Sequence, residues 1–136
     1  MSWSWTFRGY LRQGENIVQA WYDHQTAAVR AEFDLLMQTL RSRSQHDWAD
    51  IGASKPLKGA GKGLIELRFT VEKVRYRPIG FFGVGQQVFT ILTIATKHDF
   101  DQQRARAATR KPLVQANPGA NSDECDCLRS ITRKAW

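Results

Sequence analysis

The sequence contains no long apolar run, no internal repeat and few cysteines, and each absence excludes a class of protein. No apolar stretch approaches the roughly 18 residues that a membrane-spanning helix requires. Residues 1–7 have neither a basic start nor a continuous apolar segment, so we expect no secretory signal. These absences predict a protein that has no membrane partner and works in the cytoplasm.

Only two cysteines, Cys125 and Cys127, occur among the 136 residues. A structural zinc site takes about four ligands, so two thiols cannot complete one. A redox pair or half of a metal site remain alternatives, but the pattern favours two free thiols in a tail, and we assign them no role. We predict no metal and no cofactor.

The chain is instead rich in positive charge, with 20 Lys and Arg against 13 Asp and Glu, a net charge of +7. Residues 55–77 contain seven basic and two acidic residues, and residues 97–111 contain five and two, whereas residues 1–54 contain five and six. A localised positive field attracts polyanions and speeds their encounter. We expect a sheet to bring the two basic segments together as a nucleic-acid-binding surface.

The N-terminal half predicts a strand followed by helices. Apolar residues alternate with polar ones over residues 3–7, as in a half-buried strand. Apolar residues then recur at helical spacing over residues 15–41, and a polar patch at residues 24–26 indicates that this segment forms two antiparallel helices. Next we expect a loop that is anchored by Trp48 and Ile51.

The second half predicts a three-stranded antiparallel meander. The expected strands are residues 64–69, 74–82 and 88–96, the last wholly uncharged, as a central strand would be. A Gly/Lys-rich loop, residues 55–63, precedes them. Together with the N-terminal half this is an α+β domain.

A short helix is expected to follow the strands, capped by Asp99 and ended by Pro112. The sequence therefore predicts a domain over residues 1–112 and a mobile tail over residues 113–136.

Four segments, in this order after a helical half, resemble the RelE/HigB-type toxins, with the phage-derived HigB-like branch the most similar. They are residues 55–59 (KPLKG), 63–69 (GLIELRF), 76–82 (YRPIGFF) and 89–98 (FTILTIATKH). The resemblance spans residues 3–110 and leaves the tail unmatched. Several RelE relatives carry a tyrosine in their final helix, whereas this chain has none after Tyr76.

The resemblance implies a RelE-like fold, with an N-terminal strand and helical pair packed on an antiparallel sheet. It also implies a type II toxin–antitoxin toxin that enters the ribosomal A site and cuts messenger RNA, so that translation is inhibited. In this family the ribose 2′-hydroxyl attacks the adjacent phosphate without a metal. A small antitoxin with a DNA-binding domain is the implied partner.

Three residues are the catalytic candidates. Arg68 offers a planar, permanently charged fork to two phosphate oxygens, although it could also be a surface arginine paired with Glu66 or Glu72. His98 can exchange a proton near neutral pH, and Lys97 can bind phosphate or carry a proton. Their alternatives are a surface histidine and a solvated lysine at a strand end.

The RNA-binding candidates lie on the loop and the next strand. Lysines on a flexible loop follow phosphates without demanding one geometry, and two arginines on one strand face extend the track. The candidates are Lys55, Lys58, Lys62, Arg75 and Arg77. The loop is not a Walker loop, because Lys62 is followed by glycine instead of Ser or Thr.

Two other functions remain open. The ParE branch of the same fold acts on DNA gyrase and is not a nuclease, since a fold does not imply an activity. The chain could also be a basic domain that binds nucleic acid without chemistry, and its affinity would then fall steeply with salt while no cut product forms.

Overall fold

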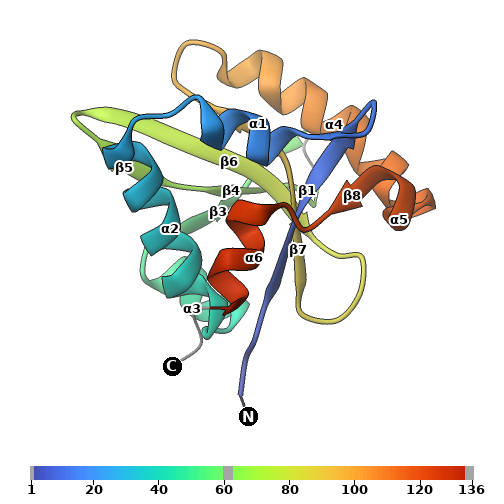
Figure 1. Ribbon diagram of the computed structural model, residues 1–136, viewed down its shortest axis with the longest axis horizontal. Helices are drawn as coiled ribbons and strands as arrows, with labels where there is room; N and C mark the ends of the chain where they lie inside the picture. The colour runs from blue at the N-terminus through green and yellow to red at the C-terminus, as the bar shows by residue number, and fades with distance from the viewer. Residues whose placement is uncertain (1, 60–62, 134–136) are drawn as a thin grey trace.

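The computed structural model describes residues 2–59 and 63–133, and these residues form one mixed sheet between two helical layers (Figure 1). The strands are β1 (Thr6–Arg12), β2 (Glu15–Asn16), β3 (Ser54–Pro56), β4 (Ile65–Leu67), β5 (Phe69–Val71), β6 (Val74–Phe82), β7 (Val88–Ala95) and β8 (Ser122–Asp123). The helices are α1 (Ile17–Asp23), α2 (Ala27–Arg41), α3 (Gln45–Asp50), α4 (Phe100–Ala116), α5 (Pro118–Asn121) and α6 (Asp126–Arg133). The α+β class is confirmed.

The sheet order is β2-β1-β7-β6-β4-β3, with β5 paired to β6 and β8 paired to β1. The β4, β6 and β7 strands form an antiparallel meander as predicted, and uncharged β7 lies inside the sheet. The single strand expected over residues 64–69 is instead split at Arg68 into β4 and β5, which both pair with β6. The expectation of a purely antiparallel sheet is wrong, because β1 pairs parallel to β7. The helices between β1 and the meander form a long crossover, which a parallel pair requires.

Two apolar clusters fill the two faces of the sheet. The larger cluster joins the sheet to α1, α2, α3 and α6, and its buried residues include Phe7, Phe33, Trp48 and Phe89. The smaller cluster, which includes Ala107 and Val114 of α4, packs on the other face. Figure 1 accordingly shows α4, in orange, separated by strands from α2 and α6.

A register shift in β7 changes which of its side chains lie on each face of the sheet. Ile79 pairs with Thr93 while Gly80 pairs with Ile91, so Leu92 is an extra residue on β7. A bulge of this kind changes which side chains face each way. Beyond Leu92, Ile94 packs against the larger cluster and Ala95 joins the α4 cluster, the reverse of what simple alternation from Ile91 and Leu92 would give.

Two helices with a break at residues 24–26 are confirmed. Thr26 caps α2, and its side chain accepts a hydrogen bond from the Val29 amide at 3.3 Å. The loop expected before β3 instead contains α3, which Ser44 caps in the same way. Trp48 is fully buried as predicted, but Ile51 is 45% exposed and anchors nothing.

The α4 helix runs past Pro112 to Ala116, so the predicted end of the helix is wrong. A proline inside a helix removes one hydrogen bond and crowds the preceding turn. Packing beyond it outweighs that cost, because Val114 is fully buried and the Leu113 carbonyl accepts a hydrogen bond from Asn121 Nδ2 at 3.0 Å.

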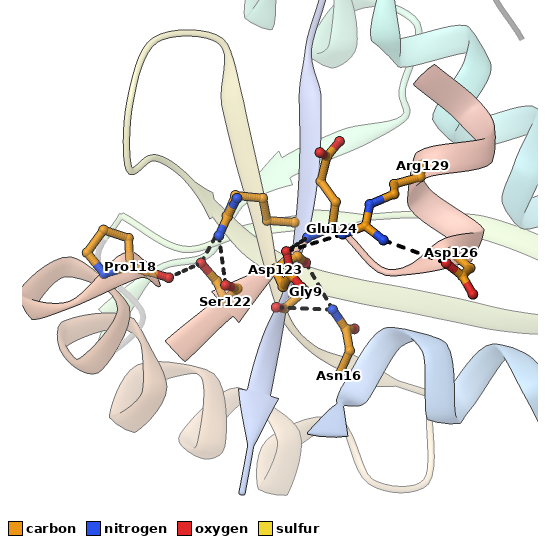
Figure 2. A network of polar contacts seen from close by, with 9 residues as sticks. Gly9, Asn16, Pro118, Ser122, Asp123, Glu124, Asp126 and Arg129 are labelled. Atoms are coloured by element: carbon orange, nitrogen blue, oxygen red, sulfur yellow. Dashed lines mark hydrogen bonds and ion pairs between the residues drawn. The ribbon is translucent and has the colours of Figure 1, made fainter. Parts of the chain in front are cut away.

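The tail expected from residue 113 onward is instead part of the fold. The β8 strand pairs with β1, and Arg8 Nη2 donates to the Ser122 carbonyl at 2.7 Å. Figure 2 shows Asn16 beside β8, where its Nδ2 donates to the Asp123 carbonyl at 2.9 Å. Leu128 and Ile131 of α6 are buried in the larger cluster. The boundary placed at residue 112 is therefore wrong, because apolar residues beyond it complete the core.

Among the helices in the described segments, none is both long and apolar enough to cross a bilayer.

Candidate nucleic-acid interface

A cavity of about 470 Å³ opens where β3, β4, the β5–β6 hairpin and the start of α4 meet. We call it the basic cavity, because six of its lining residues are Lys or Arg and one is acidic. The lining residues are Lys55, Pro56, Leu57, Lys58, Glu66, Arg68, Arg75, Arg77, Phe100 and Arg104. The cavity thus gathers Arg68 with most of the predicted RNA-binding residues.

A buried carboxylate organises the basic cavity. The Glu66 side chain is only 7% exposed, and its Oε2 accepts a hydrogen bond from Arg68 Nε at 2.9 Å. The same oxygen lies 3.7 Å from Arg77 Nε. Burying a carboxylate is costly unless opposite charge and hydrogen bonds compensate. Glu66 therefore holds both guanidinium groups in place.

Arg68 keeps part of its hydrogen-bonding capacity. Its contact with Glu66 runs through Nε, and its side chain is 29% exposed. Among residues 2–59 and 63–133, its recorded side-chain hydrogen bond is the one from Nε to Glu66. A guanidinium has five N–H donors, so the outer edge of Arg68 can bind two oxygens of a phosphate. Pairing with Glu66 and binding of an anion are thus compatible roles.

The α4 helix brings the second basic segment to the cavity. The Arg77 guanidinium carbon lies 5.1 Å from the centre of the Phe100 ring, a cation–π arrangement at the first residue of α4. One turn later, Arg104 lines the cavity. Gly59 has a φ of +76°, and a Cβ there would lie 3.3 Å from Arg104 Nη2, so Gly59 lies close to the end of this α4 side chain. The two basic segments meet as predicted.

Lys97 and His98 lie elsewhere. Both are exposed in the turn between β7 and α4, and neither lines the basic cavity. Asp99 shapes this turn by accepting a hydrogen bond from the Thr96 amide at 2.8 Å. Partial burial opposes ionisation of Asp99, but hydrogen bonds from Thr96 and Gln103 outweigh it and lower the pKa of this carboxyl. The catalytic candidates are therefore split between the cavity and the adjacent turn.

Sequence reasoning did not single out Phe100 and Arg104 as lining residues, and one candidate cannot be placed. Glu66 was expected on the polar face of its strand as a possible partner of Arg68, and the pairing is confirmed. Phe100 and Arg104 had no such signal, because helix periodicity does not reveal which element a face meets. Lys62 lies outside the described residues.

A second cavity, of about 480 Å³, lies between β1 and α4. Its lining includes Arg12, Arg106 and Arg110. Arg110 is fixed by a hydrogen bond from Nη1 to the Leu92 carbonyl at 2.8 Å, and its guanidinium lies 4.7 Å from the centre of the Tyr10 ring. Burial lowers the pKa of Arg110. Positive charge therefore flanks α4 at both cavities.

The arrangement can bind a phosphate chain and present rigid guanidinium groups to one phosphate. Within the part of the chain that the structure describes, no cluster of three or more His, Cys, Asp or Glu residues is placed to hold a metal ion. Comparison of the chain with family models, curated proteins and solved structures gives no match.

Proposed function

We propose that this chain is a toxin of a type II toxin–antitoxin system, related to the HigB-like branch of the RelE family, and that it cuts messenger RNA on the ribosome. The observation that carries the proposal is the orientation of Arg68 by the buried Glu66 inside a cavity lined by six cations. Rigid charge suits a transition state in which negative charge grows on phosphate oxygens.

The Glu-Leu-Arg segment supports the proposal in a second way. It is the most specific part of the resemblance to the family, and Glu66 and Arg68 form an ion pair that lines the cavity. The order of a first strand, a helical pair and an antiparallel meander also agrees with a RelE-like fold.

In the proposed reaction the 2′-oxygen attacks the phosphorus, a base takes its proton, and the 5′-oxygen leaves with a proton from an acid. Arg68 and Arg77 would stabilise the charged phosphorane. Lys97 and His98 are the proton-carrier candidates, and their turn would have to come within hydrogen-bond reach of the phosphate that Arg68 binds. Lys55, Lys58 and Arg75 would hold the neighbouring phosphates.

A second function has its own observation. Because Lys97 and His98 do not line the cavity that contains Arg68, a basic domain that binds nucleic acid without cutting it also fits the geometry. The two functions are distinguished by whether cut RNA forms, and not by how tightly the chain binds RNA.

Primer extension on a defined messenger in a purified translation reaction tests the proposal. We expect cuts at codon-spaced positions that require ribosomes and disappear with Arg68→Ala and with His98→Ala. Arg43→Ala is the matched control, since Arg43 is exposed and lies outside the lining of the basic cavity. Intact messenger with normal peptide output would reject the nuclease and favour plain binding or gyrase inhibition.

A neighbouring gene for a small protein with a DNA-binding domain would encode the proposed antitoxin. Co-expression of the two should restore translation, and the basic cavity offers an acidic segment of that partner a surface of complementary charge.

A further inference from the structure

The two cysteines form a close thiol pair under α6. Cys125 Sγ and Cys127 Sγ lie 3.1 Å apart, neither is in a disulfide, and the residues are only 8% and 5% exposed. A disulfide bond is about 2.05 Å long, so closing the pair requires a movement of only about 1 Å.

The backbone around the pair is held by hydrogen bonds. The Cys127 amide donates to Gln19 Oε1 of α1 at 2.8 Å. The Cys125 carbonyl accepts from the amides of Leu128 at 3.0 Å and Arg129 at 2.8 Å. These contacts keep both sulfur atoms at the start of α6, and this preorganisation favours reaction with each other over reaction with another chain.

The two thiols differ in character. The hydrogen bond from Cys127 lowers the pKa of the Cys125 thiol even though burial opposes it, and the first amides of α6 add to the effect. The same hydrogen bond, followed by burial, raises the pKa of Cys127. Because the thiolate is the reactive form, Cys125 is the nucleophile of the pair.

A cavity of about 380 Å³ gives access to Cys125 and selects what can reach it. Its lining includes five carboxylates, and Arg129 is its one cation. The acidic residues are Glu15, Asp23, Asp123, Glu124 and Asp126. Negative charge at the entrance repels anionic thiol reagents and leaves a small neutral oxidant free to enter.

We propose that Cys125 and Cys127 are a modification site that a neutral hydroperoxide oxidises to an intramolecular disulfide. The Cys125 thiolate attacks the terminal OH oxygen of the peroxide, the O–O bond breaks, and Cys125 becomes a sulfenic acid as hydroxide leaves from hydrogen peroxide, or alkoxide from an organic hydroperoxide. Cys127 sulfur then attacks Cys125 sulfur, the S–S bond forms, and the sulfenic oxygen leaves as water with the Cys127 proton. Each sulfur loses one electron, and the peroxide gains two. The site does not depend on the proposed nuclease activity.

The test is treatment of the reduced, folded chain with hydrogen peroxide, followed by intact-mass measurement and peptide mapping. We expect the loss of two hydrogen atoms, a link between Cys125 and Cys127, and full recovery with dithiothreitol. In Cys127→Ser, Cys125 should stop at a sulfenic acid that dimedone traps. In Cys125→Ser, Cys127 should stay reduced at the same dose.

A comparison of the folded with the unfolded chain distinguishes the reactivity of this site from that of ordinary cysteines. The measured quantity is the rate at which a neutral pyridyl disulfide reacts with Cys125 divided by the rate of an anionic aromatic disulfide. This ratio should be at least about tenfold higher in the folded protein than in the unfolded chain. Circular dichroism confirms that each serine variant is folded. The proposal is overturned if both thiols stay reduced in the folded chain, if only linked dimers form, or if reagent charge has no effect.

Discussion

Arg68 Nε donates a hydrogen bond to Glu66 Oε2 at 2.9 Å, and the carboxylate is almost completely buried while the arginine is not. The two residues are separated by Leu67, so a strand places both side chains on one face. Glu66 belongs to β4, whereas Arg68 lies at the break between β4 and β5. Buried Glu66 therefore fixes the direction of the partly exposed Arg68 side chain, and the Arg68 guanidinium faces the basic cavity with little conformational freedom.

Glu66→Gln separates the two functions that fit the basic cavity. The substitution removes one negative charge, so a plain electrostatic binder should hold RNA more tightly. A nuclease that depends on an oriented Arg68 should instead cut about tenfold to hundredfold more slowly, because the guanidinium is no longer aligned. Filter binding and primer extension measure the two effects. Tighter binding with unchanged cutting would show that Glu66 does not position Arg68.

The salt dependence of RNA binding should identify which cations contact phosphate. Arg75→Gln should lower the slope of log affinity against log salt by about 0.7, the value for one contact with a single strand. Lys73→Gln is the matched control, since Lys73 lies in the same hairpin and outside the lining of the cavity. Equal slopes for the two variants would argue against a specific path across the cavity.

Gly9 and Asn16 should be energetically coupled. A Cβ at Gly9 would lie in steric conflict with the Asn16 side chain. Asn16 Oδ1 caps α1 by accepting from the Val18 amide at 2.9 Å. We expect Gly9→Ala to lower the free energy of unfolding by about 1–3 kcal/mol and Asn16→Ala by about 1 kcal/mol.

The double variant tests the coupling, because Asn16→Ala removes part of the obstacle to a side chain at position 9. Denaturant unfolding should give a combined loss that is smaller than the sum by about 0.5 kcal/mol or more. Strict additivity would mean that the backbone moves to relieve the conflict.

Tyr22 should make stability fall in strongly alkaline solution. Burial, together with its hydrogen bond to Asp34, raises the pKa of Tyr22 from 10.0 to about 12. A raised pKa contributes stability that is complete below pH 10.0 and is lost as pH rises toward about 12. Tyr22→Phe should be less stable at neutral pH and should flatten the decline in that window. Unfolding free energies of both chains across this range provide the measurement, and parallel curves would contradict the assignment.

Leu128→Ala tests whether residues beyond 112 belong to the domain. Leu128 of α6 is fully buried, so truncation should lower the free energy of unfolding by about 2–4 kcal/mol. Leu35→Ala removes the same atoms from a side chain that is 56% exposed and should cost less than about 0.5 kcal/mol. A mobile tail would make the Leu128 substitution as mild as the Leu35 one.

The sequence by itself determined the local elements whose periodicity is strong. The α2 pattern, the uncharged β7 and the alternation around Arg68 depend on which neighbouring side chains share a face, and that information is local. The same alternation placed Arg75 and Arg77 on one side, where both now line the basic cavity.

Only the tertiary structure decided how these elements meet. The parallel pairing of β1 with β7, the continuation of α4 past Pro112 and the burial of Leu128 depend on contacts between residues far apart in the chain. Local propensity at Pro112 and in the polar segment after it favoured the end of the helix and a mobile tail. Burial of apolar surface outweighed that preference. For the same reason, a sequence that contained every charge of the basic cavity did not show that Arg104 would complete it, nor that Lys97 and His98 would lie outside it.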